Sequence, residues 1–230
     1  MIVSIHQPNY IPWLGYFYKI AVSDIFVFLD NVQFTKGDFI NRVKIYSPQK
    51  EYQWLTIPVN VSNETIINTI EINHNWQQKH LKTIVQIYSK AKYFNDIFKE
   101  IEKIYLSEYK FLSELNMALS KYIISKFHLN TKIFKSSDLD IEKKLSSDSR
   151  LIEIVKRLNG MKYLSGSGGF NYQSVQKFNN LNIDVLSYSI NKKFTYETKY
   201  KDKIGLSILD FIFNEGFNRE LLLNFGEIVK

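Results

Sequence analysis

Two apolar runs within the first 42 residues, each ending abruptly in a polar segment, constrain the fold of this 230-residue chain more than any other feature. Residues 2–5 are apolar and lead into the polar segment 6–10, and a helical pattern begins near Leu14. Residues 25–29 are again apolar and stop at the polar segment 30–33. This order favours an open parallel sheet, in which loops at the carboxyl ends of strands form the ligand crevice. We therefore expect the chemistry of the chain at these two loops.

The patterns in the rest of the chain predict a mixed α/β domain. Alternation over 42–46 and an extended pattern over 52–59 predict a β-hairpin. Helical spacing from Trp76 to about Leu129 predicts two or three helices with core-facing stripes, broken near 91–93. Residues 147–188 read as helix, strand, glycine-rich loop, helix and strand, which again favours a parallel sheet. The prediction is completed by short strands at 70–72 and 131–134 and by helices at 204–213 and 218–225.

Cysteine is absent, so disulfides, thiolate nucleophiles and iron–sulfur clusters are excluded. The apolar runs fall far short of the roughly 18 residues that a membrane span needs. The N-terminus lacks the basic region and cleavage site of a signal peptide, and we expect a cytoplasmic protein. The four histidines are scattered without paired ligand spacing, so the sequence predicts no dedicated metal site.

The net charge of +7 leaves two interpretations open. Much of the lysine excess lies between Lys79 and Lys144, and it can attract a nucleic acid, a nucleotide or a membrane surface. It can also form the solvated polar faces of helices, which the helical spacing of this region favours. The aromatic residues follow buried periodicity rather than an exposed stacking platform, which argues against nucleic acid as a partner.

Two residues at the predicted strand ends are candidates for catalysis. His6 can act as a general base, because the unperturbed pKa of histidine lies near neutrality. Its alternative is a structural histidine bonded to a backbone carbonyl. Asp30 can orient a histidine, bind a ribose hydroxyl or hold a metal, and its alternative is a turn residue in an Asx motif. The polar neighbours of both residues favour a functional role.

Further polar residues are candidates for binding. The side chains that we expect to contact a substrate are Gln7, Asn9, Tyr10, Gln33 and Asn41. Arg42 can bind a carboxylate or phosphate through two parallel hydrogen bonds, or lie on a strand surface. His80 is a second candidate base on a predicted helix. The loop of Ser165, Gly166, Ser167, Gly168 and Gly169 can present backbone N–H groups to an anion, or form a plain turn.

Several collinear segments cover nearly the whole chain and carry a family resemblance. They are residues 5–17 (IHQPNYIPWLGYF), 24–34 (DIFVFLDNVQF), 41–42 (NR), Trp76 with 79–80 (KH), 88–94, 163–166 (YLSG) and 207–210 (SILD) through Gly216. In these segments the chain resembles the WbqC-like protein family. Members are associated with bacterial surface-polysaccharide gene clusters, for O-antigen or capsule. The resemblance implies work on amino sugars, often nucleotide-linked, with N-acylation as the step.

The layout also resembles nucleotidyl-transferring and adenylate-forming enzymes such as pantothenate synthetase. There a strand leads to a His-x-Gly-His turn, and the next strand ends in a loop with Gln-Phe. Gly15 and residues 33–34 (QF) match this layout, whereas Trp13 and Tyr16 replace both histidines. The likeness implies a parallel-sheet, nucleotidyltransferase-like (Rossmann-like) core with a small β-hairpin and a helical segment, and it leaves ATP open as a cofactor.

The resemblance implies a single domain over residues 1–230, with a helical insertion at about 75–130. The expected function is transfer of an acyl or aminoacyl group from a donor or carrier to the amine of a nucleotide-linked amino sugar. His6 accepts the proton, Asp30 orients His6 or the sugar, and Arg42 with the glycine-rich loop holds phosphate. The alternative is a binding or assembly protein of the polysaccharide machinery without chemistry of its own. Whether the chain forms a homodimer stays open.

Overall fold

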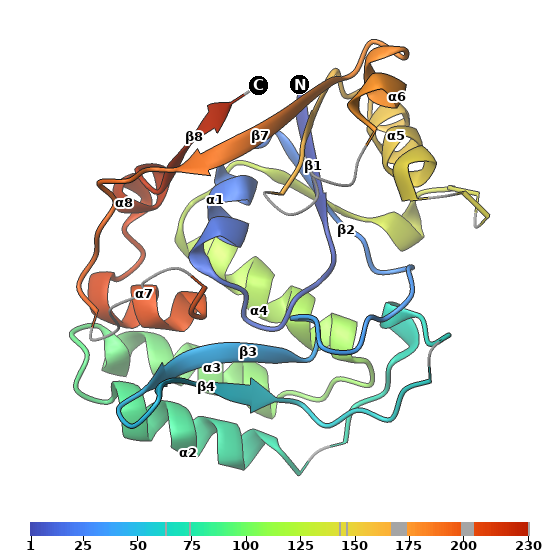
Figure 1. The fold of residues 1–230 in the computed structure, drawn as a ribbon. Coiled ribbons are helices and arrows are strands. Elements are labelled where there is room, and N and C mark those ends of the chain that lie inside the picture. The colour runs from blue at the N-terminus through green and yellow to red at the C-terminus, as the bar shows by residue number, and fades with distance from the viewer. Residues whose placement is uncertain are drawn as a thin grey trace.

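The computed structural model describes residues 1–62, 64–73, 75–142, 144–145, 147–166, 174–198 and 205–229. These residues form a six-stranded sheet with helices on both faces, and a separate two-stranded hairpin (Figure 1). The structure is thus a mixed α/β fold with a mostly parallel central sheet. Within the described residues, no helix combines the length and the apolar character that crossing a bilayer requires.

The strands and helices have these bounds. The strands are β1 (Ile2–His6), β2 (Ile25–Phe28), β3 (Arg42–Ser47), β4 (Glu51–Thr56), β5 (Lys132–Lys135), β6 (Lys162–Leu164), β7 (Asp184–Ile190) and β8 (Gly226–Val229). The α-helices are α1 (Leu14–Ala21), α2 (Gln77–Tyr88), α3 (Phe94–Leu106), α4 (Leu112–Lys126), α5 (Ser147–Arg157), α6 (Val175–Asn179), α7 (Ile208–Glu215) and α8 (Arg219–Leu223). Two short 3-10 helices are η1 (Ile67–Thr69) and η2 (Ser136–Asp138).

The order of strands in the sheet is β5-β2-β1-β6-β7-β8. The first five of these strands run parallel, and β8 pairs antiparallel with β7 at the edge. The chain moves outward from β1 to β2 and β5 and then returns to the other side of β1 with β6. This reversal places the switch point of the topology between β1 and β6, where α/β sheets bind their ligands.

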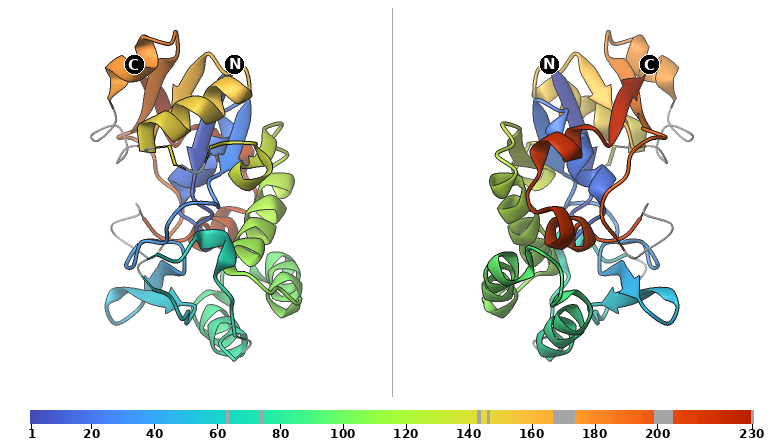
Figure 2. Two further views of the ribbon diagram at one scale, coloured as in Figure 1. Left: turned by 90° about the vertical axis from the view of Figure 1, so that its right-hand side faces the viewer. Right: turned by 90° about the vertical axis from the view of Figure 1, so that its left-hand side faces the viewer.

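Alternate side chains of the strands pack into two apolar layers, one on each face of the sheet. Val3 and Ile5 belong to the layer covered by α5 and α6. Phe26 and Phe28 belong to the opposite layer, which α1, α4, α7 and α8 cover. The two side views show α5 on one face of the sheet and α8 on the other (Figure 2). His6 is in phase with Ser4 rather than with Ile5, so its side chain lies on the face of α1.

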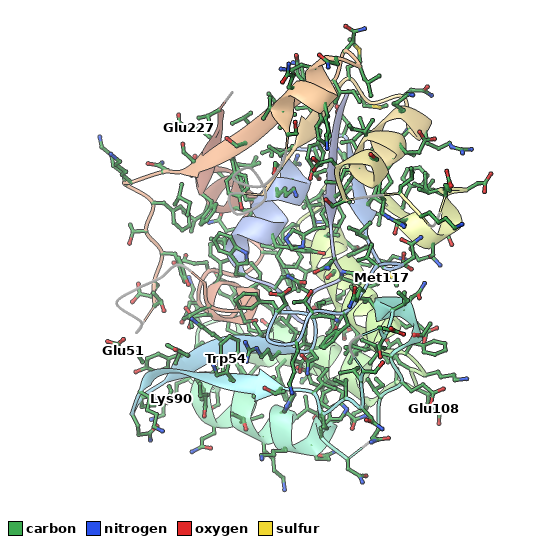
Figure 3. All side chains as sticks on the ribbon, turned by 45° about the vertical axis from the view of Figure 1, so that its right-hand side comes forward. Glu51, Trp54, Lys90, Glu108, Met117 and Glu227 are labelled. Carbon is green, nitrogen blue, oxygen red and sulfur yellow. The ribbon has the colours of Figure 1, made fainter. Side chains whose placement is uncertain are left out.

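The hairpin and helices α2 and α3 form the lower half of the molecule in Figure 1, and α4 lies between them and the sheet. Their core is continuous with the α1 face of the sheet, because one apolar cluster contains residues from both halves. Trp54 lies on β4 in the lower half, whereas Glu227 lies on β8 in the upper half (Figure 3). The backbone N–H of Ser207, directly before α7, donates to the carbonyl of Lys44 in β3 at 2.8 Å and so joins the two halves.

The structure confirms the predicted hairpin, the helical region with its break near residues 91–93, and the parallel order of the strands. The prediction of a strand at 70–72 was wrong. The 3-10 helix η1 precedes this segment, and Glu71 makes a single bridge to Phe111. The final predicted helix was too long, because α8 ends at Leu223 and the chain turns into β8.

Candidate functional site

Two adjoining cavities lie at the carboxyl ends of the parallel strands, and together they form what we call the crevice. The larger cavity has a volume of about 900 Å³ and the smaller one about 510 Å³. Both are lined by Gln7, Leu29 and Leu151. Polar residues of the larger cavity include Asn31, Gln33, Asn68, Thr69, Ser137, Ser147 and Arg150. Polar residues of the smaller cavity include His6, Asn9, Tyr16, Lys19, Tyr163, Ser165 and Tyr188.

The loop that follows β1 is fixed by distant parts of the chain. Asn116 of α4 is fully buried, and its Nδ2 donates to the carbonyls of Pro8 and Ile40, both at 2.8 Å. The Ser207 hydroxyl donates to the carbonyl of Ile11 at 2.9 Å. Ile11 itself has a φ of 39°, a strained conformation for a β-branched residue. Such strain persists only where surrounding contacts enforce it, so this wall of the crevice is preorganised.

His6 stands at the end of β1 and lines the smaller cavity. Its Nδ1 donates to the Gln7 carbonyl at 3.2 Å, because a carbonyl can only accept. Nε2 is therefore the lone-pair nitrogen of the ring. The imidazole packs edge-to-face against Tyr16, with ring centroids 4.8 Å apart. Burial, and next the nearby charge of Lys19, lower the pKa of His6 to about 3, so the imidazole is neutral at physiological pH.

Lys19 and Arg150 are cations of the crevice that the sequence interpretation missed. Lys19 lies on α1, is only 2% exposed and lines the smaller cavity. Burial lowers the pKa of Lys19 to about 7. Arg150 lies on α5, is 8% exposed and lines the larger cavity. A signal for Lys19 exists in the sequence, since it is the single charged residue in the apolar segment LGYFYKIA of α1.

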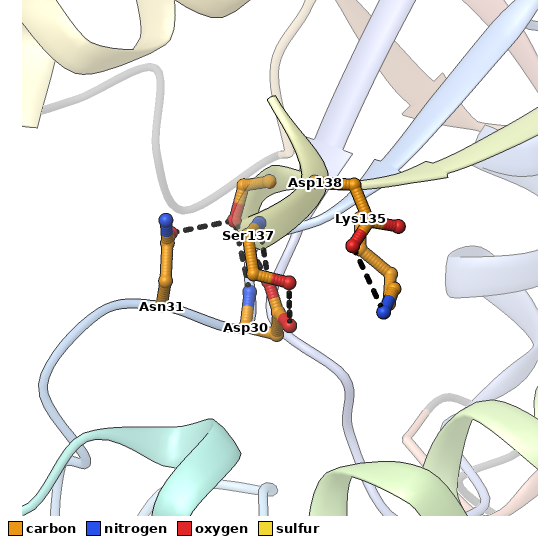
Figure 4. Close-up of polar contacts among 6 residues, drawn as sticks. Asp30, Asn31, Lys135, Ser137 and Asp138 are labelled. Carbon is orange, nitrogen blue, oxygen red and sulfur yellow. Dashed lines mark hydrogen bonds and ion pairs between the residues drawn. The ribbon is translucent and has the colours of Figure 1, made fainter. Parts of the chain in front are cut away.

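Asp30 does not bond to the imidazole of His6 in the described part of the chain. Its carboxylate instead stabilises the wall of the crevice. Its carboxylate accepts hydrogen bonds from the Ser137 backbone N–H at 2.9 Å, the Ser137 hydroxyl at 2.6 Å and the Ser136 hydroxyl at 3.0 Å (Figure 4). Within the described residues, no hydrogen bond or ion pair joins Asp30 to His6. The bonds instead tie the exit of β2 to the exit of β5, and they place Asn31 and Ser137 in the larger cavity.

Tyr10 and His80 meet in the core of the lower half. The Tyr10 hydroxyl donates to Nδ1 of His80 at 2.8 Å and also contacts the Tyr105 hydroxyl. His80 is 4% exposed, and burial lowers its pKa to about 4, while a hydrogen bond to the Thr56 carbonyl raises it. His80 is thus a neutral core histidine with both ring nitrogens in use. The structure places neither Tyr10 nor His80 among the lining residues of the crevice.

The structure divides the other expected binding residues. Gln7 and Asn9 line the smaller cavity, and Gln33 lines the larger one. Asn41 donates to the Ile57 carbonyl at 2.9 Å, which ties the ends of the β3–β4 hairpin. The Arg42 guanidinium donates to the Gly37 carbonyl and stacks on Trp54, with 4.2 Å from Cζ to the ring centroid. Neither Asn41 nor Arg42 is among the residues that line the two cavities.

The glycine-rich loop is described only at its start. Ser165 and Gly166 follow β6 and line the smaller cavity, where a Cβ added to Gly166 would meet nothing within 4 Å. Ser167, Gly168 and Gly169 lie outside the described residues. The crevice therefore joins the exits of β1, β2, β5 and β6 and the N-terminal part of α5.

Comparisons with known proteins identify the family of the chain. The model of the WbqC-like protein family matches residues 7–220, which include the residues that line the crevice from Gln7 onward, although Ile5 and His6 precede the match. The chain is 32% identical over 219 residues to the uncharacterized protein Rv1507c of Mycobacterium tuberculosis, and the match covers 93% of this chain and 94% of that protein. The chain belongs to the WbqC-like protein family.

Proposed function

We propose that this protein is an enzyme of bacterial surface-polysaccharide biosynthesis. In this proposal it transfers an acyl or aminoacyl group to the amine of a nucleotide-linked amino sugar, in the crevice and on a nucleotidyltransferase-like core. The observation that carries the proposal is the neutral imidazole of His6 in a crevice at the carboxyl ends of β1 and β2, where most polar side chains of the lining are uncharged and two, Lys19 and Arg150, are basic.

The polar lining suits a sugar. Gln7 and Asn9 border the smaller cavity, and Asn31, Asn68 and Thr69 border the larger one. Amide and hydroxyl side chains both donate and accept hydrogen bonds, as the hydroxyls of a sugar do. The combined volume exceeds what one monosaccharide needs, which leaves room for the nucleotide or the donor.

Aromatic rings beside the crevice suit the nucleotide part of such a substrate. Phe39 lines the smaller cavity and is 41% exposed. The Trp54 ring lies 5.8 Å from it, centroid to centroid, and is 37% exposed. Exposed aromatic rings stack on nucleobases, because every base has a π-face. We therefore assign the base to the side of the crevice that faces the hairpin.

In the proposed reaction His6 accepts a hydrogen bond but does not take up a proton, because its pKa is low. The amine nitrogen attacks the carbonyl carbon of the activated donor, the new N–C bond forms as the bond to the leaving group breaks, and one amine proton departs with the leaving group. With its pKa lowered to about 3 by burial, His6 stays neutral and its Nε2 accepts a hydrogen bond from the amine. This bond orients the nitrogen lone pair toward the donor, which is the positioning contribution to catalysis. Asp30 supports the wall that carries Asn31 through its bonds to Ser136 and Ser137, and the Ser136 hydroxyl also donates to Asn31.

The test is a pair of substitutions at His6. Asn in His6→Asn retains a donor near the Gln7 carbonyl but removes Nε2, whereas His6→Gln offers a polar atom nearer the Nε2 position. We expect His6→Asn to lower kcat/KM by about 10²-fold, the loss that follows when the attacking amine is no longer oriented, and His6→Gln to lose less. The protein is incubated with nucleotide-linked amino sugars and candidate donors. Mass spectrometry identifies the product, and the amount formed with time gives the rate.

The matched control is His128→Asn, because His128 is exposed at the end of α4 and lies far from β1 in the sequence. Circular dichroism confirms that each variant is folded. Full activity of His6→Asn contradicts the role of the imidazole. If the wild-type protein binds the sugar, as seen by thermal shift, but yields no product with any donor class, the non-catalytic binding protein is the correct alternative.

A further inference from the structure

Lys19 has an unusual place for a lysine. It lies in the middle of α1 with its side chain 2% exposed, and its Nζ donates to the Ile5 carbonyl at 2.8 Å. The remaining donors of the ammonium group lie at the smaller cavity, which Lys19 lines together with His6 and Gly166.

The pairing of β1 explains why the amine reaches this point. The His6 carbonyl accepts from the Leu29 N–H at 2.8 Å, on the β2 side of the strand. Neighbouring carbonyls of a strand point in opposite directions, so the Ile5 carbonyl points toward β6. The pairing with β6 ends where Leu164 meets Ser4, one residue earlier. Nζ of Lys19 thus binds a carbonyl that the sheet leaves unpaired, at the switch point between β1 and β6.

No counter-charge accompanies this cation in the described part of the chain. The described ion pairs do not include Lys19, and the lining residues of both cavities contain neither Asp nor Glu. Burying an unpaired charge is costly, and burial correspondingly lowers the pKa of Lys19 to about 7. A neutral, apolar side chain would fill the same space without that cost. Retaining an amine there is explained if a ligand supplies the negative charge.

We propose that the smaller cavity is an oxyanion subsite, in which Nζ of Lys19 binds a phosphate or carboxylate group of the ligand. The inference rests on the proposed function for the identity of that ligand. A phosphate would belong to the nucleotide-linked sugar, and a carboxylate to the donor. The N-terminal end of α1 supports the assignment, since Trp13 and Gly15 line the same cavity and a helix N-terminus favours anions.

The geometry also revises the position expected for phosphate. Arg42 is engaged with the Gly37 carbonyl and Trp54, and it is not among the residues that line either cavity. Lys19 instead provides a cation at the first residues of the glycine-rich loop, because Ser165 and Gly166 line the same cavity. The backbone at Gly166 has open space where a side chain would begin, so a ligand can approach it closely.

The experiment measures oxyanion binding directly and does not depend on turnover. Inorganic phosphate, pyrophosphate and acetate are titrated into the wild-type protein, Lys19→Met and Lys99→Met at constant ionic strength and pH 7, with calorimetry and thermal shift as readouts. Lys99→Met is the matched control, because Lys99 is exposed on α3 and its loss changes the net charge equally. We expect Lys19→Met to weaken binding at least about tenfold, the contribution of a hydrogen bond to a charged group, and Lys99→Met to leave it unchanged.

A structural role for Lys19 predicts a different result. Because Lys19→Met leaves the Ile5 carbonyl without its donor, Tm falls under either role; a purely structural role predicts unchanged anion affinity in the folded variant, whereas an amine kept for a ligand predicts weakened anion binding. Should Lys19→Met not fold, Lys19→Gln keeps a donor for the Ile5 carbonyl and removes the charge. Phosphate or pyrophosphate binding assigns the subsite to the nucleotide, and acetate binding assigns it to the donor.

Equal oxyanion binding by the wild-type protein and the Lys19 variants overturns the inference, even if acyl transfer is observed. Absence of binding of every oxyanion to the wild-type protein overturns it as well. Failure of the transfer assay alone does not, because loss of binding in Lys19→Met still demonstrates the subsite.

Discussion

At the scale of residues, burial decides what the two candidate bases can do. His6 and His80 have the same side chain, yet one lines a cavity and the other has both ring nitrogens bonded in the core. Burial lowers the pKa of both, to about 3 for His6 and about 4 for His80. The sequence identified His6 correctly as a residue at a strand end, but the environment of either ring depends on residues far away in the chain. For that reason the pKa of neither histidine could be predicted from the sequence.

These histidines predict an acid-sensitive fold. Unfolding restores their pKa values to about 6.5, so between pH 6.5 and 3 the unfolded chain binds more protons and stability falls as pH falls. Urea unfolding at pH 7 and pH 4 measures the change. His80→Leu should reduce this pH dependence and cost about 1–3 kcal/mol at pH 7, because the Tyr10 hydroxyl loses its acceptor. An unaltered slope in His80→Leu contradicts the assignment.

The lowered pKa of Lys19 predicts that oxyanion binding changes with pH above neutrality, whereas the histidines act below it. Burial lowers the pKa of Lys19 to about 7, so the amine is charged below that pH and increasingly neutral above it. Binding should therefore weaken between pH 7 and 9 and be accompanied by proton uptake. Calorimetry at pH 8 in two buffers of different ionisation enthalpy measures the uptake. Binding without proton exchange at pH 8 would show that another group holds the anion.

At the scale of elements, local patterns predicted the strands but not the contacts between their exits. Residues 2–6 and 25–28 form strands because their apolar runs are local signals. Asp30, by contrast, bonds to Ser136 and Ser137, more than 100 positions away in the chain. No periodicity links such distant residues. The missed strand β8 has a similar cause, because its partner β7 lies some 40 positions earlier.

A substitution at Asn116 of α4 tests whether this helix holds the loop after β1 in place. Asn116→Leu retains the approximate volume and removes the donor to the Pro8 and Ile40 carbonyls, so both become unpaired in the core. We expect a loss of about 1–3 kcal/mol in the free energy of unfolding, measured with urea. We also expect weaker substrate binding, because the loop that carries Asn9 loosens.

The matched variant is Asn95→Leu on α3, where the side chain is exposed. A surface change of this kind should alter stability by no more than about 0.5 kcal/mol. If both leucine variants behave alike, the bonds of Asn116 do not hold the loop.

At the scale of the whole molecule, the two halves share one core. A single apolar cluster runs from the α1 face of the sheet through α7 to the hairpin and helices α2 to α4. The helical segment near residues 75–130 therefore packs as part of the main fold. The spacing of apolar residues predicted the buried stripes of these helices. It could not predict which layer the stripes pack against, because a stripe indicates burial without identifying the partner.

A shared core predicts one cooperative unfolding transition. Trp13 contacts Phe225 in the upper half, and Trp76 contacts Tyr105 in the lower half. Variants that keep either residue as the sole tryptophan should give the same urea midpoint by fluorescence as by circular dichroism. Two separated midpoints would divide the chain into two domains and contradict the expectation of a single one.

The bond from Ser207 to Ile11 has a consequence for how the protein is made. The strained turn at Ile11, in the loop that follows β1, is held by a hydroxyl that leaves the ribosome nearly two hundred residues later. During synthesis the early strands can form while this turn is still free to relax. The crevice therefore matures late, and a nascent chain stopped before α7 should contain much of the sheet without a competent binding site.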